Sequence, residues 1–76
     1  MRVVREVEHT RCKITIFSWS LKFLIKLEKG PYEQTFKISE LDVAESELDD
    51  ILSDDFINDA INRFDSMHAS LQKHLF

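Results

Sequence analysis

Residues 12–39 read CKITIFSWSLKFLIKLEKGPYEQTFKIS, and this stretch decides the fold. Apolar and polar residues alternate in three successive runs, at 13–19, 22–28 and 32–38. Alternation with a period of two is typical of strands that bury one face of a sheet. The gaps between the runs have the length of tight turns. We therefore predict three antiparallel strands that follow one another in the order of the sequence.

The parity of the apolar residues also predicts the register of the first two strands. With a two-residue turn at 20–21, Phe17 faces Leu24 on one side of the sheet, and Ile16 faces Ile25 on the other. A slip of one residue would set every core residue opposite a polar one, so this register is strongly favoured. The turn itself is Ser-Leu, which lacks the Gly or Asn that primed hairpin turns prefer, and its type stays open.

The second turn contains Gly30-Pro31, the only glycine and the only proline in the chain. An even-length loop there pairs Ile25 with Phe36, whereas a three-residue loop would pair apolar residues with polar ones. The even loop also places Glu28 beside Glu33. Such a like-charge pair costs a few tenths of a kcal/mol. We predict the even loop because the apolar pairing outweighs this repulsion.

Residues 2–9, RVVREVEH, predict either a fourth strand or an ordered N-terminal arm. If a strand ran unbroken from Val3, then Val3 and Val7 would share the solvent side with Lys13. A β-bulge or a separate pairing is needed to turn these valines toward the core.

After residue 39 the apolar spacing changes from two to three and four. A short helix is expected from about 43 to 52, with Leu48, Ile51 and Leu52 turned inward. Ser53 is a good N-cap for a long last helix. That helix carries an apolar stripe, in which a partly buried His68 is expected at the edge. The stripe consists of Ile57, Ala60, Ile61, Phe64, Met67, His68, Leu71 and Leu75.

These elements predict an α+β fold in a single domain, 1–76. It contains a three-stranded antiparallel meander, or a four-stranded one if residues 1–10 add a strand. A short and a long C-terminal helix then pack on one face of the sheet. A chain of 76 residues buries only about 60% of its unfolded surface, so its core is thin.

The charge is unevenly distributed along the chain, whose net charge is −4. Residues 1–39 hold eight Lys/Arg and four Asp/Glu, and residues 40–76 hold two Lys/Arg and ten Asp/Glu. One cysteine excludes a disulfide within the chain and is typical of a reducing compartment. The N-terminus lacks a signal-peptide pattern, and no apolar run reaches the roughly 20 residues that span a bilayer. We expect a cytoplasmic protein with no membrane partner.

The chain contains His, Cys and Asp residues, but their spacing does not match that of a metal site or a catalytic site. His9 with Cys12, or Asp65 with His68, falls short of the ligand number of a zinc site. Cys12 shares parity with Ile14 and is expected to pack as a small apolar residue. A single glycine leaves no phosphate-binding loop. We therefore expect no catalytic residue, no metal and no cofactor.

The outer sheet face is the feature that stands out. It is expected to present Phe17, Trp19 and Leu24, surrounded by the lysines Lys13, Lys22, Lys26 and Lys37. A monomer rarely leaves such an apolar patch unused.

Three explanations for this face compete. It forms a homodimer or binds another protein, since aromatic residues within a charged rim are typical of interfaces. It stacks the bases of a single-stranded nucleic acid. Or the N-terminal arm folds over it and makes a second small core. The first explanation is preferred, and the negative net charge counts against the second.

Four segments resemble small bacterial proteins of an uncharacterised family. They are ITIFSW at 14–19, IKLE at 25–28, EQTFK at 33–37 and SELDV at 39–43. The resemblance implies the same order of sheet first and helices second. It carries no activity, ligand or catalytic residue. The sequence thus predicts a non-enzymatic module for protein interaction or self-association, with nucleic-acid binding as the alternative.

Overall fold

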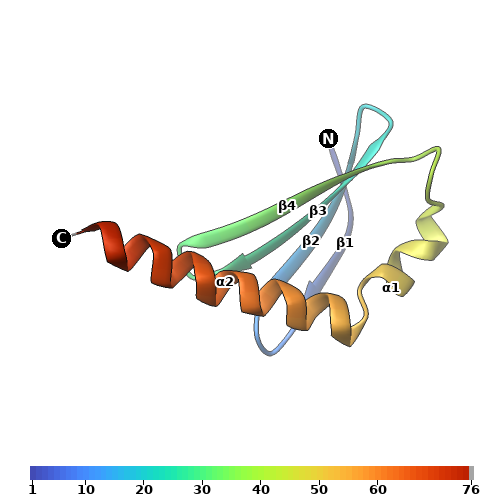
Figure 1. Ribbon diagram of the computed structural model, residues 1–76. Helices are drawn as coiled ribbons and strands as arrows, with labels where there is room; N and C mark the ends of the chain where they lie inside the picture. The colour runs from blue at the N-terminus through green and yellow to red at the C-terminus, as the bar shows by residue number, and fades with distance from the viewer. Residues whose placement is uncertain (76) are drawn as a thin grey trace.

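The computed structural model describes residues 1–75, which form one antiparallel sheet with its helices on one face (Figure 1). The sheet has the order β1-β2-β3-β4, and this arrangement confirms the predicted α+β fold. The elements are β1 (Arg2–Glu8), β2 (Lys13–Trp19), β3 (Lys22–Lys29), β4 (Tyr32–Ser39), the 3₁₀ turn η1 (Glu45–Glu47), α1 (Leu48–Ile51) and α2 (Asp54–Leu75).

Strands β2, β3 and β4 pair in the predicted register. Phe17 faces Leu24 across β2 and β3, and the like-charge pair of Glu28 and Glu33 forms across β3 and β4. Lys26 relieves this repulsion, because its Nζ lies 3.9 Å from a carboxylate oxygen of Glu28 and 3.4 Å from one of Glu33. A cation between two carboxylates makes the favoured apolar register compatible with its one unfavourable charge pair.

The N-terminal residues form a fourth strand, β1, which pairs with β2 and contains a bulge. Val3 pairs with Phe17, and Arg5 pairs with Ile16, so one extra residue is accommodated between them. The bulge reverses the parity of β1, because an extra residue turns the following side chains to the opposite face. Val3 therefore lies on the outer face, whereas Val7 lies opposite Ile14 on the inner face and packs against the core.

The β2–β3 and β3–β4 hairpins close with two-residue turns of different chemistry. Gly30 has φ of 60°, a conformation that glycine adopts without a steric cost. Ser20 and Leu21 also have positive φ, 55° and 63°, as a type I′ turn requires. The left-handed conformation costs a residue with a Cβ about 1–2 kcal/mol, so the β2–β3 turn is strained.

The core lies between the inner sheet face and the helices. Strands β2 and β3 supply Ile14, Ile16, Phe23, Ile25 and Leu27, and the helices supply Leu48, Ile57, Ala60, Ile61 and Phe64. Ser53 caps α2 as predicted, because its Oγ accepts a hydrogen bond from the Phe56 N–H at 3.2 Å. The segment before it is a 3₁₀ turn followed by a four-residue α1, and it begins where Glu47 Oε1 accepts from the Ala44 N–H at 3.0 Å.

Only the first half of α2 covers the sheet. Its buried residues end at Phe64, and its C-terminal turns project beyond the β3–β4 turn (Figure 1). His68 lies in this projecting part and is exposed, so the expectation of a partly buried histidine is wrong. The apolar stripe of α2 is longer than the sheet beneath it, which is why its last residues remain in solvent.

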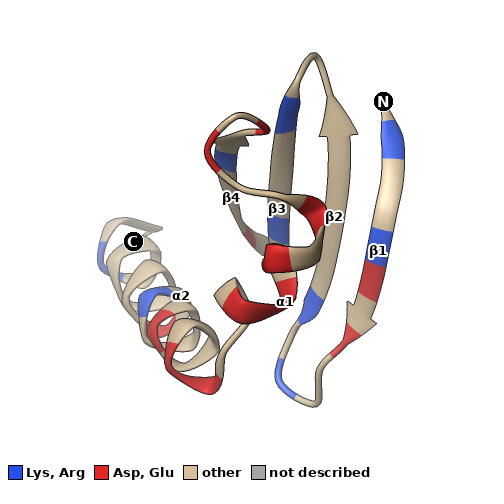
Figure 2. Ribbon diagram, turned by 90° about the vertical axis from the view of Figure 1, so that its right-hand side faces the viewer, with Lys and Arg blue, Asp and Glu red and all other residues tan. Residues whose placement is uncertain are grey.

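Charged residues separate by element, as the sequence indicates. Asp and Glu gather on η1, α1 and the first turns of α2, whereas most Lys and Arg lie on the strands (Figure 2). Arg5 of β1 forms an ion pair with Asp49 of α1, which joins the two regions at the edge of the sheet.

Candidate interaction face

The outer face of the sheet carries a continuous apolar row across three strands. Val3 of β1 pairs with Phe17 of β2, and Phe17 pairs in turn with Leu24 of β3. Trp19 lies two residues after Phe17 in β2 and therefore on the same face. We call Val3, Phe17, Trp19 and Leu24 the outer patch. Among residues 1–75, no helix or strand lies over it, because α1 and α2 pack on the opposite face (Figure 1).

The residues of the outer patch differ in how far they reach into solvent. Trp19 is 54% exposed and Val3 is 51% exposed, Phe17 is half-buried, and Leu24 is only 8% exposed. Leu24 is shielded because it lies between Phe17 and Lys37, its pairing partners on the two neighbouring strands. The sequence predicted Phe17, Trp19 and Leu24 as one presented surface, and the structure adds Val3 beside Phe17. The structure makes Leu24 its floor and Trp19 its most accessible part.

The lysines around the outer patch fall into two groups. Lys26 lies between Glu28 and Glu33, and Lys13 pairs across the strands with Glu28. Lys22 and Lys37 form no ion pair with any residue in the described part of the chain. Lys22 pairs across the β2–β3 hairpin with Trp19, and Lys37 pairs with Leu24. Lys13 forms no ion pair in residues 1–75 either, but it lies in register with Glu28. The half of the face around Lys26 therefore holds two lysines and two glutamates, whereas the apolar half holds Lys22 and Lys37 without a paired carboxylate among the described residues.

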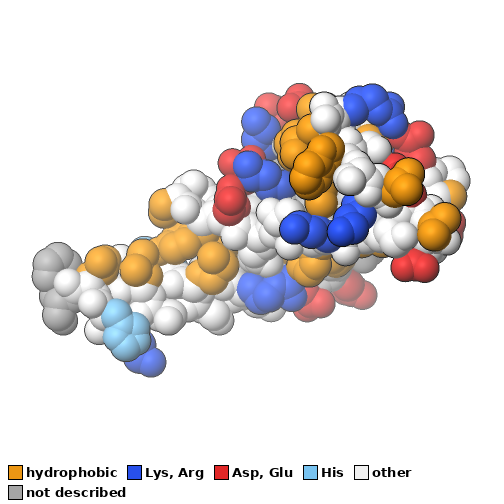
Figure 3. All heavy atoms as spheres, turned by 90° about the horizontal axis from the view of Figure 1, so that it is seen from above, with side chains coloured by type: hydrophobic (Ala, Val, Ile, Leu, Met, Phe, Trp, Pro, Cys, Tyr) orange, Lys and Arg blue, Asp and Glu red, His pale blue; other side chains and the backbone are white. Residues whose placement is uncertain are grey.

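More exposed apolar residues lie at the same end of the sheet. Leu21 of the strained turn is 75% exposed, and Leu41 of the loop after β4 is 93% exposed. The Glu40 N–H donates a hydrogen bond to the Leu21 carbonyl oxygen at 3.0 Å, which brings the turn and the loop together. Seen from above, hydrophobic side chains gather between Lys and Arg side chains at the end far from the C-terminus of α2 (Figure 3).

Leu21 is unfavourable in two ways, because its backbone is strained and its apolar side chain faces water. Residues held in such conformations cluster at functional sites, where the surrounding structure enforces them. A glycine or asparagine would form the same turn at lower cost. Leu21 therefore adds an exposed apolar side chain at the end of the sheet that carries Trp19.

The residues considered for chemistry lie in two separate hollows. His9 and Cys12 line one of about 350 Å³ near the β1–β2 turn. His68 and Asp65 line another of about 420 Å³ beside the β3–β4 turn. Within residues 1–75, no group of three or more His, Cys, Asp or Glu side chains is arranged to hold a metal ion.

Cys12 is 7% exposed and packs in the core cluster, as expected from its parity with Ile14. Burial raises the pKa of its thiol above the ordinary value, and the nearby charges of Arg11 and Lys29 offset this only in part. A protonated buried thiol is a poor nucleophile. His9 is held locally, because its Nδ1 accepts a hydrogen bond from the Arg11 N–H at 3.1 Å.

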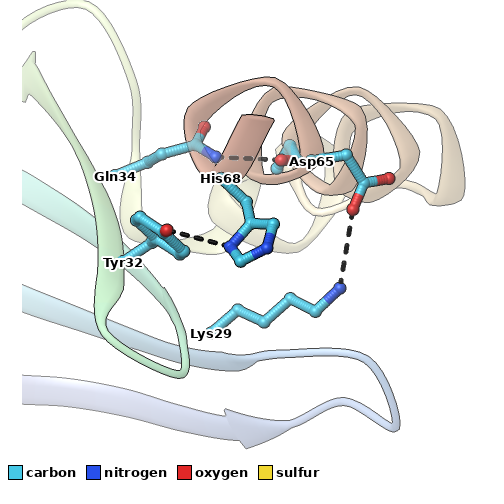
Figure 4. Close-up of polar contacts among 6 residues, drawn as sticks. Lys29, Tyr32, Gln34, Asp65 and His68 are labelled. Carbon is cyan, nitrogen blue, oxygen red and sulfur yellow. Dashed lines mark hydrogen bonds and ion pairs between the residues drawn. The ribbon is translucent and has the colours of Figure 1, made fainter. Parts of the chain in front are cut away.

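The hollow beside the β3–β4 turn was not predicted from the sequence. Tyr32 Oη and His68 Nδ1 are 3.0 Å apart, and their rings meet edge to face (Figure 4). Asp65 points away from this pair and lies 4.0 Å from Lys29 Nζ (Figure 4). Asp65 and His68 therefore do not act as a pair. The only sign of this contact in the sequence was the alternation in residues 32–38, which places Tyr32 on the sheet face that α2 covers.

A polar bridge fixes α2 against the edge strand β4. Gln34 Nε2 donates to the Ala60 carbonyl oxygen at 2.9 Å, and Gln34 Oε1 accepts from Arg63 Nε at 2.8 Å. The Arg63 guanidinium also lies 5.6 Å from the centre of the Phe36 ring. Gln34 is a polar residue on the inner face of the sheet, and these contacts give both its amide nitrogen and its amide oxygen a hydrogen-bond partner.

The chain matches no protein-family model, no curated protein and no solved structure. No helix formed by residues 1–75 has both the length and the apolar character needed to cross a bilayer.

Proposed function

We propose that this chain is a non-enzymatic interaction module whose outer patch binds a protein surface, either that of another protein or that of a second copy. The observation that carries this is Trp19, which is 54% exposed on a sheet face that no helix within residues 1–75 covers. Aromatic residues are enriched at the centres of interfaces, within a polar rim. Lys22 and Lys37 supply that rim.

The free charges indicate the chemistry of the partner surface. Lys22 and Lys37 favour carboxylates placed around an apolar centre, since complementary charges steer association and fix its register. The acidic segment of this same chain offers such carboxylates on η1, α1 and the start of α2 (Figure 2). A second copy is therefore a suitable partner, and so is another acidic protein.

Trp19 is the only tryptophan, so its fluorescence reports on the outer patch alone. We expect its emission to shift to shorter wavelength as the protein concentration rises, because contact with a second copy removes water from the indole. Sedimentation of Trp19→Ser, and of Phe17→Ser/Trp19→Ser, is expected to give a lower mean mass than the wild type. Thr35→Ala, on the other half of the same face, is the matched control.

The outcome that contradicts self-association is plain. If the emission of Trp19 is independent of concentration, and the wild type and both variants have equal masses, then the outer patch does not bind a second copy. Binding of a different protein is tested with an acidic amphipathic helical peptide as the probe. A shift in Trp19 emission that Lys22→Glu/Lys37→Glu abolishes supports binding of an acidic protein.

Single-stranded nucleic acid is the second candidate, because Trp19 is exposed directly opposite Lys22 on the neighbouring strand. Stacking of a base on an aromatic ring contributes about 1–3 kcal/mol, and lysines contact the phosphates. This candidate predicts that oligothymidylate quenches Trp19 fluorescence and that the affinity falls steeply with salt. The carboxylates Glu28 and Glu33 on the same face, together with the net charge of −4, favour the protein partner.

A further inference from the structure

The C-terminal part of α2 forms a projecting arm: Met67 and His68 at its base still touch the rest of the chain, and residues 69–75 are all exposed. The helix continues for eleven residues after Phe64, its last buried residue, and ends at Leu75. At 1.5 Å per residue this is about 16 Å of helix. The molecule is accordingly elongated, with extents of 44 × 25 × 19 Å. Figures 1 and 3 both show the arm extending away from the sheet.

The arm keeps the apolar stripe of the buried half. At 100° per residue, Leu71 and Leu75 fall within about 20° of Phe64 around the helix axis, and Met67 falls about 60° away. Leu71 is 44% exposed and Leu75 is 47% exposed. Lys73, the only Lys, Arg, Asp or Glu in residues 66–75, falls about 180° away, on the opposite side.

An isolated helix shorter than about 12–15 residues is marginal in water. The arm of eleven residues is shorter than this, and the contacts that hold it to the rest of the chain lie at its base, where Asp65 meets Lys29, Met67 packs against the core and His68 meets Tyr32. Leu71 and Leu75 lie on the same side of the helix as the buried Phe64, so we expect another surface to cover them.

We propose that the projecting arm is a dimer interface, on which the same arm of a second copy packs antiparallel, with Leu71 against Leu71 at the two-fold axis. Such an interface must be self-complementary, because the same patch serves both copies. Met67, Leu71 and Leu75 meet this condition, since they are spaced by four residues on each side of Leu71. In the antiparallel pair, Leu75 of the second copy then lies against Met67.

The charge pattern is compatible with this occupant. All ten Asp/Glu of residues 40–76 lie at or before Asp65, so no carboxylate side chain is carried into the contact by either copy. Lys73 points away from the stripe, and its charge stays in solvent. An acidic or basic partner would find no opposite charge on this face, whereas an identical arm requires none.

The arm also has a hollow where the second copy is expected to insert a side chain. Tyr32, Ser66, Met67, Ser70, Leu71 and His74 line a depression of about 580 Å³. It opens at the level of Met67, where the antiparallel register brings Leu75 of the second copy. Filling it with a leucine removes apolar surface of both copies from water, at roughly 25 cal/mol per Å².

The size of the arm sets the expected strength of the dimer. A stable interface buries about 800 Å² per partner, and one face of a three-turn helix covers less than this. We therefore expect a reversible dimer with a dissociation constant in the micromolar range. The mean mass should rise from monomer to dimer across that range of concentration.

Cross-linking tests the predicted two-fold contact. In a Cys12→Ala background, Leu71→Cys places two thiols against each other at the axis. A short bismaleimide is expected to convert most of this variant into covalent dimer. Lys73→Cys, on the same turn but the opposite side, is the matched control and is expected to stay monomeric. Equal cross-linking of the two variants would overturn the proposed arrangement.

Sedimentation supplies the second readout. Leu71→Ser/Leu75→Ser is expected to have a lower mean mass than the wild type and Lys73→Ser at the same concentration, because it loses association through the arm. Both leucines are exposed in the monomer, so circular dichroism should show that the sheet and the first half of α2 remain folded. A folded double variant with the mass of the wild type would contradict the arm as the interface.

The arm and the outer patch lie at opposite ends of the molecule, so their tests separate. Leu71→Ser/Leu75→Ser leaves Trp19 and its concentration-dependent emission unchanged, whereas Trp19→Ser leaves the cross-linking through residue 71 unchanged. Failure of either readout therefore rejects one interface without touching the other.

Discussion

Glu40, which follows the end of β4, is hydrogen-bonded to Leu21 just before the start of the neighbouring strand β3. Its backbone N–H donates to the Leu21 carbonyl oxygen at 3.0 Å, and its carboxylate accepts a hydrogen bond from Ser18 Oγ at 2.8 Å. One residue after β4 thus holds both the strained β2–β3 turn and the end of β2. These two hydrogen bonds support the conformation in which Trp19 is exposed.

We expect Glu40→Ala to destabilise the chain by about 1–2 kcal/mol, because the Ser18 hydroxyl loses a charged acceptor in a partly buried position. Urea denaturation measures the effect. Glu40→Gln retains an acceptor oxygen and is expected to recover most of the loss. Equal destabilisation by the two variants would indicate that the Ser18 contact contributes nothing.

Replacing the strained turn is expected to separate stability from binding. Ser20→Asn/Leu21→Gly supplies residues that accept positive φ and should raise the free energy of unfolding by about 1 kcal/mol or more. The same change removes an exposed leucine beside Trp19, so the outer patch should bind more weakly. Thermal unfolding and the concentration dependence of Trp19 emission test the two effects. A variant that is more stable and binds equally well would show that Leu21 is not a contact residue.

The bridge between β4 and α2 should behave as a coupled pair. Gln34→Ala leaves the Ala60 carbonyl and Arg63 without their partner, and Arg63→Ala removes one of the same hydrogen bonds. We expect each to cost about 1 kcal/mol and the double variant to cost less than the sum. A double-mutant cycle measures the coupling. Strict additivity would mean that the two side chains do not interact in solution.

Cys12 should make stability fall at alkaline pH. Its thiol has a raised pKa in the folded chain, so the unfolded chain loses this proton first as the pH rises. The folded state then binds more protons than the unfolded state, and the free energy of unfolding decreases with pH. The stabilisation is complete below the ordinary thiol pKa and is lost as the pH rises through the folded value. Denaturation of wild type and Cys12→Ala across this range should show a steeper fall for the wild type.

The sequence predicted the sheet well because parity is a strict constraint. Ile16 and Ile25 can face each other only in one register once a core face is defined, and the structure has that register. The bulge in β1 was one of two alternatives, because its position between Val3 and Arg5 depends on the partner strand and leaves no mark in local composition.

The candidate site was harder to predict, since exposure depends on neighbours in space. Leu24 looks like Trp19 in the alternation pattern, but Phe17 and Lys37 flank Leu24 on both sides and shield it. The stripe of α2 likewise predicted a buried face along its whole length. A periodic pattern shows which residues share a side of a helix, but not where the sheet beneath it stops.

The bulge in β1 affects how copies of this chain can associate. An unpaired edge strand normally offers its main-chain groups as a template for another strand. Here the irregular spacing between Val3 and Arg5, together with the charged side chains of Arg5, Glu6 and Glu8, interrupts that template. Growth of the sheet by edge-to-edge pairing of strands is thereby disfavoured at β1, so the chain can expose apolar side chains without forming fibrils through this edge.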